Sequence, residues 1–204
     1  MQQNPYHTAS LQELQAGITR GDEAAFTRLY ELFYHKLTHF SYSLVRSREL
    51  AEEVVEDVFV KLWSDKALTA KIENLTVYLY VAVKNRSLNT LSSKAKELVA
   101  APFDYLDNLP GAVLSASPYD LMVSREMMAR VQQAVDQLPP RCKMIFRLIR
   151  EDGLRYKEVA EILNISINTI DVQMAIAVKK ICTALQIEKP EKHPLTATFS
   201  LRKK

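Results

Sequence analysis

The chain has 204 residues, of which 48% are hydrophobic and 25% are charged, enough for one or two small domains with apolar cores. It has only four glycines and no Asn-Gly or Asp-Gly hairpin turn between alternating apolar runs, so the sequence predicts an all-α fold. The net charge of +3 does not by itself indicate nucleic-acid binding.

The N-terminus lacks the basic-then-apolar pattern of an export signal, and no apolar run reaches membrane-spanning length. Cys142 and Cys182 lie far apart and have no CxxC spacing, so reduced thiols in a cytoplasmic protein are expected. His35 and His39 form an i, i+4 pair without a third metal ligand, which favours a surface or packing role and predicts no metal site. No catalytic constellation or cofactor motif occurs, so an enzyme is not expected.

The first half of the chain predicts a series of amphipathic helices. After a disordered stretch at 1–9, Ser10 is expected to cap a short helix, and Asp22 to cap a long one that runs to Val45 with an aromatic core-facing stripe. The next helix covers 49–63, and 64–73 is expected to be a loop.

The helix at 49–63 combines an aliphatic stripe with an acidic surface. Leu50, Val54, Val58 and Leu62 repeat every four residues, as in a core-facing helix. Taken alone, its acidic residues are most often a solvated face. These residues are Glu52, Glu53, Glu56 and Asp57.

The following helix, capped by Asn74 and extending to about residue 94, interleaves basic and aromatic residues. Such a surface suits single-stranded nucleic acid, because cations follow the phosphates and rings stack on bases. An ordinary amphipathic helix is the alternative. The residues expected to face outward are Tyr78, Tyr80, Lys84, Asn85, Arg86 and Lys94.

Residues 97–118 contain three prolines and a glycine within a polar stretch, which indicates a flexible linker between two domains. Helices are then expected at 119–138, with Leu121 and Met128 among the inward residues, and from Pro140 onward. The basic tail at 188–204 is expected to be mobile.

Residues 153–185 contain two helical patterns separated by the short break Asn164-Ile165-Ser166. The first covers 156–163, and Ser166 is a good N-cap for the second. Two helices joined by so short a turn, with Ile165 pointing inward, predict a helix-turn-helix whose second helix enters a major groove. A helical hairpin that packs on another element is the alternative.

The segment LPPRCKMIFRLIREDGLRYKEVAEILNISINTIDVQMAIAVKKI resembles the C-terminal DNA-binding region of bacterial sigma factors, above all the two-domain extracytoplasmic-function group. AEEVVEDVFVKLW and the helix after it resemble the polymerase-binding and −10-reading parts of the same family. The resemblance covers about 10–96 and 120–186 and implies two small helical domains joined by a flexible linker. The domain boundaries it implies are 1–96 (sigma region 2), 97–118 (linker), 119–187 (sigma region 4) and 188–204 (tail).

The family resemblance implies a dissociable subunit that binds core RNA polymerase and promoter DNA, without a cofactor, and that an anti-sigma factor, often membrane-bound, holds inactive. The polymerase contacts would be Glu52, Glu53, Val54, Glu56 and Asp57. The −10 element would meet Asn74, Tyr78, Lys84, Asn85 and Arg86. The −35 element would meet Arg155, Lys157, Ser166, Asn168, Thr169, Val172, Gln173, Ile176, Lys179 and Lys180.

The sequence departs from the family pattern in the C-terminal region. Arg155 stands where a capping Ser or Thr is usual, so that helix cap is expected to be missing. Val172 and Ile176 are apolar where a soluble helix is normally polar, so they are expected to contact either thymine methyls or another protein, such as an anti-sigma factor. Two other readings remain: a helix-turn-helix regulator that acts without polymerase, and a helical bundle that binds only proteins.

Overall fold

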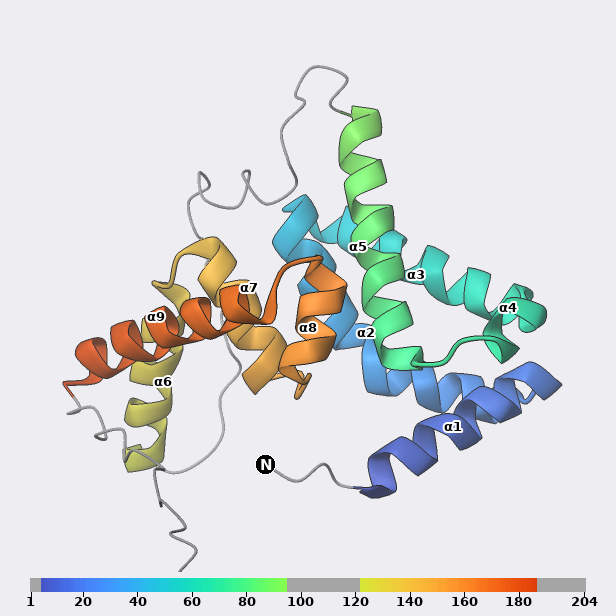
Figure 1. Ribbon diagram of the computed structural model, residues 1–204, viewed down its shortest axis with the longest axis horizontal. Helices are drawn as coiled ribbons and strands as arrows, with labels where there is room; N and C mark the ends of the chain where they lie inside the picture. Colours follow the sequence, from blue (N-terminus) through green and yellow to red (C-terminus); the bar gives the residue numbers. More distant parts are fainter. Residues whose placement is uncertain (1–4, 95–121, 187–204) are drawn as a thin grey trace, which may run out of the picture.

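The computed structural model describes residues 5–94 and 122–186, and the secondary structure of these residues is entirely helical (Figure 1). The predicted all-α class is therefore confirmed. The N-terminal part comprises α1 (Pro5–Arg20), α2 (Glu23–Val45), α3 (Arg48–Ser64), α4 (Lys66–Ala70) and α5 (Leu75–Lys94). The C-terminal part comprises α6 (Met122–Asp136), α7 (Pro140–Arg150), α8 (Tyr156–Leu163) and α9 (Ile167–Leu185).

The long helix α2 organises the N-terminal part, packing against α1, α3 and α5. Its predicted cap is present, because the Asp22 carboxylate accepts the backbone N–H groups of Ala24 and Ala25 at 2.9 and 3.3 Å. Its apolar stripe is buried as the helical period requires. The buried aromatic and aliphatic residues of that stripe are Leu29, Phe33, Leu37 and Phe40.

Two boundaries differ from those expected. Helix α1 begins at Pro5 rather than at Ser10, which suits a proline because it has no N–H to leave unpaired in the first turn. The stretch 64–73 contains the short helix α4, capped by the Asp65 carboxylate, which accepts the N–H of Leu68 at 2.9 Å. The Thr69 hydroxyl donates to the Leu62 carbonyl at 2.8 Å and so ties α4 to the end of α3.

Two side chains lie on the opposite side from the one predicted. Tyr80 was expected to face outward but is only 1% exposed, and its ring packs 5.3 Å from that of Phe40. Met128 was expected to face inward but is 68% exposed on α6. Helical period alone does not decide these cases, because both depend on which neighbouring element covers the residue.

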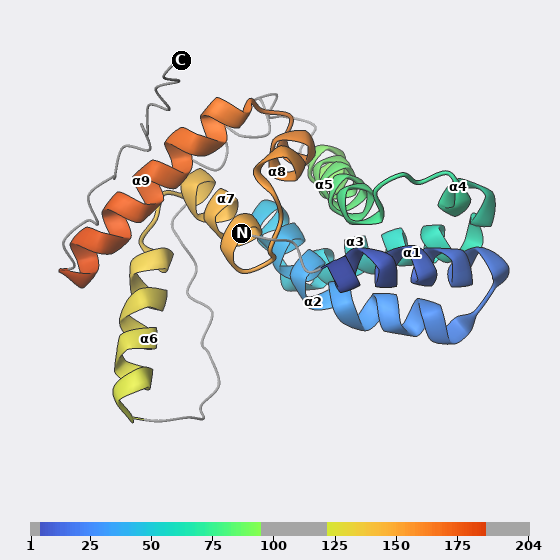
Figure 2. The ribbon, with the colours of Figure 1, turned by 60° about the horizontal axis from the view of Figure 1, so that its bottom comes forward.

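The two parts of the chain pack directly against each other. Helix α8 lies beside α5, and α7 lies close to α2, in two views of the ribbon (Figures 1 and 2). A single cluster of buried apolar side chains runs from α1 through α5 into α7, α8 and α9. A smaller cluster joins α6, α7 and α9 around Val135, Cys142 and Ala177. The predicted linker at 97–118 and the tail at 188–204 lie outside the described residues.

Candidate nucleic-acid and protein interfaces

Helices α8 and α9 and the three residues between them have the predicted helix-turn-helix arrangement. Helix α8 ends at Asn164, which adopts the left-handed conformation with φ 54°, a conformation that asparagine tolerates better than most residues. Ile165 follows and packs on the main core. The Ser166 hydroxyl then accepts the N–H of Thr169 at 3.1 Å and caps α9, so the turn follows from local sequence.

The outer face of α9 carries most of the residues predicted to read the −35 element. Its inner face is buried through Ile170, Met174 and Ala177. Val172 and Ile176 lie on the outside, at 57% and 37% exposure, so these apolar groups are accessible to a partner. The other exposed predicted residues are Ser166, Asn168, Lys179 and Lys180, while Thr169 and Gln173 are half-buried.

The start of α8 presents Arg155 and Lys157 to solvent. The prediction that the N-terminal cap of α8 is missing is only half correct. The Glu158 carboxylate accepts the Arg155 backbone N–H at 2.9 Å, as in a capping box. The reciprocal bond is absent because a guanidinium has no acceptor; it donates instead to Glu158 at 2.8 Å. Burial opposes ionisation of Glu158, but its bonds from Arg155 and Asn74 hold the pKa of this carboxyl below its usual value.

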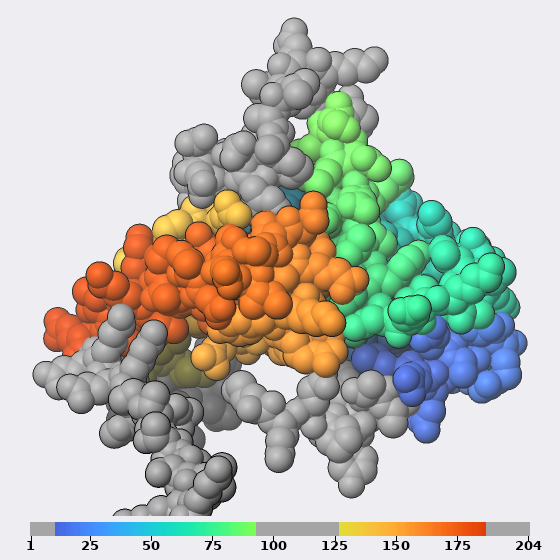
Figure 3. All heavy atoms as spheres, in the orientation of Figure 1, coloured from blue at the N-terminus to red at the C-terminus, as the bar shows by residue number. Residues whose placement is uncertain are grey.

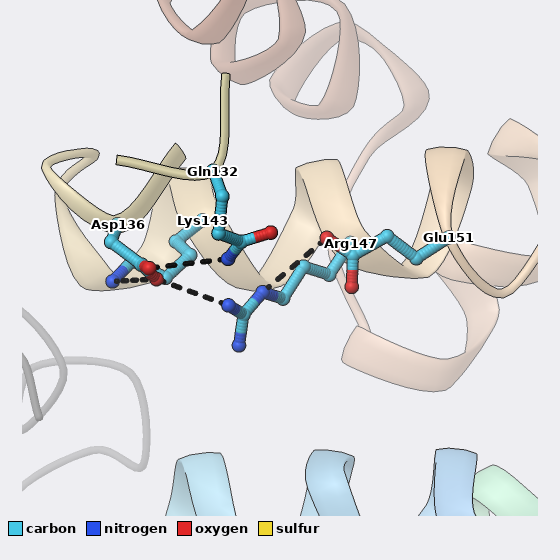
Figure 4. Close-up of polar contacts among 5 residues, drawn as sticks. All are labelled: Gln132, Asp136, Lys143, Arg147 and Glu151. Carbon is cyan, nitrogen blue, oxygen red and sulfur yellow. Dashed lines mark hydrogen bonds and ion pairs between the residues drawn. The ribbon is translucent and has the colours of Figure 1, made fainter. Parts of the chain in front are cut away.

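A polar network around one carboxylate joins α6 to α7 (Figure 4). Asp136 accepts hydrogen bonds from Gln132 at 3.1 Å, Lys143 at 3.3 Å and Arg147 at 3.1 Å. The Cys142 thiol donates to the backbone carbonyl of Gln173 at 3.2 Å, which links α7 directly to α9. Burial raises the pKa of this thiol.

The residues predicted to meet the −10 element lie along α5 but in different environments. Asn74 caps α5 by accepting the Val77 N–H at 3.1 Å, and Tyr78 is half-buried. Asn85 and Arg86 are exposed, and Arg86 donates to Asp57 of α3 at 3.0 Å. Lys84 instead donates to the Ile162 carbonyl of α8 at 2.7 Å.

The acidic residues of α3 also divide into groups. Glu53 and Glu56 are exposed, whereas Glu52 pairs with Arg48 at 2.9 Å. Asp57 is bound by Arg86, as described above. Val54 is 2% exposed and belongs to the core, so its side chain is not available to a partner in this arrangement.

Sequence reasoning missed the contacts by which three residues, Lys36, Tyr80 and Asp152, join the N-terminal and C-terminal parts. The buried Tyr80 hydroxyl donates to the Asp152 carboxylate at 2.7 Å, and Lys36 donates to the Asp152 carbonyl at 3.4 Å. Burial raises the pKa of Asp152 to about 6 and raises that of Tyr80. The apolar residues around Tyr80 in the helical pattern are the only sequence signal that indicates its burial. Asp152 carries no local signal, because its partners are distant in the sequence.

The described residues contain no group of metal-binding side chains, and none of their helices is long and apolar enough to cross a bilayer. What they do present is a helix-turn-helix with an exposed second helix, packed beside a helical bundle. A helix-turn-helix with an exposed second helix is typical of DNA-binding proteins.

Comparison with protein families gives the particular class. Residues 29–97 match the family model for sigma-70 region 2, and residues 128–181 match that for sigma-70 region 4. The chain therefore belongs to the sigma-70 family, and its relatives place it in the extracytoplasmic-function (ECF) group.

Two relatives are similar over most of their length. The RNA polymerase sigma-H factor of Pseudomonas aeruginosa is 23% identical over 180 residues, which covers 86% of this chain and 93% of the relative. The ECF RNA polymerase sigma-E factor of Escherichia coli (strain K12) is 27% identical over 166 residues, covering 78% of this chain and 85% of the relative.

Two solved structures share the fold. CnrH in complex with the cytosolic domain of CnrY superposes with a TM-score of 0.53 at 17% identity, covering 87% of this chain and 97% of CnrH. The sigma factor RpoE of Bartonella quintana, in complex with the anti-sigma factor NepR, gives a TM-score of 0.54 at 20% identity. The match covers 80% of this chain and 98% of RpoE.

Proposed function

We propose that this chain is an alternative sigma factor that binds core RNA polymerase and directs promoter-specific transcription initiation, without catalysing a reaction itself. The observation that carries the proposal is the presence of both sigma-70 regions in one chain, the second with an exposed recognition helix. A regulator that acts without polymerase would need only the second region. The acidic surface of α3 and the basic residues of α5 fit a polymerase subunit better.

The α3 surface is the proposed polymerase contact. Exposed Glu53 and Glu56 would attract a basic surface of the enzyme and accelerate association. Glu52 and Asp57 already have basic partners in this chain, so their part in binding requires exchange of those partners. Val54 would act indirectly, by holding α3 on the core.

Helix α5 is proposed to read the −10 element. Exposed Asn85 offers a hydrogen-bonding group to a separated strand, and Tyr78 offers a ring for stacking. Arg86 offers a cation once it exchanges Asp57 for a phosphate. Asn74, which caps this helix, and Lys84 within it are already engaged by α8. They become free only when α8 moves away.

Helix α9 is proposed to read the −35 element in a major groove. Asn168 and Gln173 have amides that can pair with adenine, and Val172 and Ile176 can pack on thymine methyl groups. Ser166 and Thr169, in the first turn of α9, would contact the DNA backbone or base edges. Arg155, Lys157, Lys179 and Lys180 would contact phosphates.

A protein inhibitor is a further proposed partner. The RpoE and CnrH structures each hold a second protein, in one case a named anti-sigma factor. The exposed apolar pair Val172 and Ile176 offers such a partner an anchor in the present chain. DNA reading and inhibitor binding would then compete for one face of α9.

The decisive experiment is to reconstitute core polymerase with this chain and sequence the transcripts started on genomic DNA. A shared promoter pattern upstream of those starts is expected. Failure of the chain to co-purify with core polymerase, combined with specific DNA binding alone, would favour a polymerase-independent regulator. Failure to bind any promoter fragment even with core enzyme present would favour a bundle that binds only proteins.

A further inference from the structure

The N-terminal half of α9 carries a single charged residue, and that charge is negative. Between Ile167 and Val178 the sequence contains no lysine, arginine or histidine, and Asp171 is the only ionisable side chain. The first cations of α9 are Lys179 and Lys180. A surface that served only to attach to phosphates would carry basic residues throughout. A carboxylate at this place opposes such attachment instead of supporting it.

Asp171 lies on the exposed side of α9. Asn168, Val172 and Ala175 are exposed with it, whereas Ile170 belongs to the buried inner side. Residues three and four positions apart are neighbours on a helix surface, so Asp171 lies next to Asn168 and Ala175. Figure 3 shows α9 (orange to red) along the outside of the C-terminal part. A partner that covers Asn168 and Val172 therefore also meets Asp171.

No structural role within the described part of the chain accounts for the Asp171 carboxylate. It forms no hydrogen bond or ion pair with any of the described residues. The N-terminus of α9 is already capped by the Ser166 hydroxyl, which accepts the Thr169 N–H at 3.1 Å. A carboxylate is favourable near a helix N-terminus mainly in the first turn, whereas Asp171 begins the second. The carboxylate is therefore available to accept a hydrogen bond from a partner.

In a major groove, a carboxylate distinguishes the bases by the groups that they present. Cytosine presents its N4 amino group, which donates, whereas guanine presents the acceptors N7 and O6 and thymine presents the acceptor O4. Adenine presents its N6 donor beside the acceptor N7, which repels the second carboxylate oxygen. An ionised aspartate can only accept hydrogen bonds. Contact with cytosine is therefore favoured, and contact with guanine or thymine would leave the carboxylate desolvated without a donor.

The same carboxylate weakens binding to DNA as a whole. The phosphates repel it at every sequence alike. The hydrogen bond from N4 offsets this repulsion at cytosine, whereas the acceptors of guanine and thymine add to it. Specificity that depends partly on unfavourable contacts with the wrong partner is a general device in recognition. Removal of the charge should therefore raise binding to the wrong sequences more than binding to the right one.

We infer that Asp171 reads one base pair of the −35 element and selects cytosine at that position. This inference rests on the proposed function, because it takes the exposed side of α9 to lie in the major groove. Asp171 differs from the other residues proposed for this face in acting mainly by exclusion of guanine and thymine. The alternative is that Asp171 only repels DNA, which would weaken binding to all sequences equally.

Three substitutions in the full chain, each assembled with core RNA polymerase, separate base selection from general repulsion. Asp171→Ala removes the charge and both acceptors at an exposed helix position that alanine suits. Asp171→Asn keeps the shape but adds an amino donor, which gives the side chain that pairs with adenine. Glu13→Ala removes one negative charge from the exposed surface of α1 and is the control. Each holoenzyme transcribes a barcoded promoter library with a randomised −35 region, and sequencing of the barcodes gives the preference at each position.

The wild type should favour cytosine over guanine or thymine by about tenfold at one −35 position, as expected for a single specific contact to a base edge. In Asp171→Ala this ratio should fall to about twofold or less, mainly because promoters with guanine or thymine are used more. Asp171→Asn should use adenine and cytosine about equally at that position. Glu13→Ala should keep the wild-type ratio.

Equal gains on all four bases in Asp171→Ala would overturn the inference, because general repulsion predicts that result. A wild type with −35 preferences, but with no cytosine preference that Asp171→Ala alters, would overturn it as well. A wild-type holoenzyme that initiates without any −35 preference would instead refute the proposed reading by α9, and the inference with it. The two failures are thereby distinguishable, because only the second removes the preferences at every position.

Discussion

Replacement of Asp152 by asparagine should stabilise the protein at neutral pH. The Asp152 carboxyl is buried against Tyr80, and its pKa rises from the ordinary value of 3.8 to about 6. This difference corresponds to about 3 kcal/mol, which is the cost of keeping the ionised carboxylate in its buried site. Asparagine removes the charge and still offers Tyr80 an oxygen acceptor.

The direction in which the contribution of Asp152 to stability changes with pH follows from proton linkage. Because the folded protein has the higher Asp152 pKa, this group favours the folded state fully below pH 3.8, and that contribution is lost as the pH rises through about 6. The charged groups that face Asp152 are Lys36 of α2, Arg147 of α7 and Glu151 directly after α7, and Tyr80 of α5 is its hydrogen-bond donor. All of them remain in the Asn variant.

His39 has the opposite dependence and remains in both proteins. Burial, and then the cation of Arg147, lower its pKa below 6.5, while Glu151 partly opposes this. Its contribution is therefore present above pH 6.5 and lost as the pH falls. Because this contribution is common to both proteins, the difference between them isolates Asp152.

Urea unfolding followed by circular dichroism measures this difference. Near neutral pH and above, the Asn variant should exceed the wild type by up to about 3 kcal/mol, and the gap should fall to about half near pH 5. Glu161→Gln, an exposed change on α8, should shift stability by less than about 0.5 kcal/mol. A gap that is absent, or that does not narrow as the pH falls, would refute the reasoning.

Three further predictions address the core and the two proposed interfaces. Ile162→Ala should lower the free energy of unfolding by about 2–5 kcal/mol because the side chain is fully buried, and a smaller loss in urea titration would contradict this packing. Glu53→Lys should slow association with core polymerase, most strongly at low salt, and an unchanged rate in a folded variant would remove this residue from the contact. Gln173→Ala should relax preference at one −35 position by about 1–3 kcal/mol, whereas Lys180→Ala should weaken binding to all sequences alike, as promoter libraries would reveal. Identical −35 preferences in the wild type and the Gln173 variant would exclude that residue from base reading.

The helix-turn-helix was predictable because its signals are local. The expected helix at 156–163 coincides with α8, and Ser166 caps α9 as its position in the sequence indicated. Ile165, between the two helices, packs against the main core as its position in the pattern predicted. Such features depend on residues within a few positions of one another, so sequence pattern is sufficient for them.

The surroundings of α5 were not predictable in the same way. Tyr80 has a polar hydroxyl on a helix with many polar residues, and only a partner 72 positions away satisfies it in the interior. The bond of Lys84 to α8 spans 78 positions and has no sequence signal. Helix α4 was missed because five residues are too few to show a helical period. The residues that would meet the −10 element could be proposed from sequence. The bonds by which α8 engages Asn74 and Lys84 could not.

The sharing of Asp136 among three donors has a consequence for how sequences of this kind can vary. Loss of Asp136 would leave Lys143 and Arg147 together without their common acceptor, whereas loss of one cation leaves the other still paired. Effects of substitutions at these positions should therefore be non-additive, with coupling energies on the order of 0.5–3 kcal/mol. A substitution tolerated in one sequence background would be harmful in another. Positions 136, 143 and 147 are therefore expected to change together during evolution.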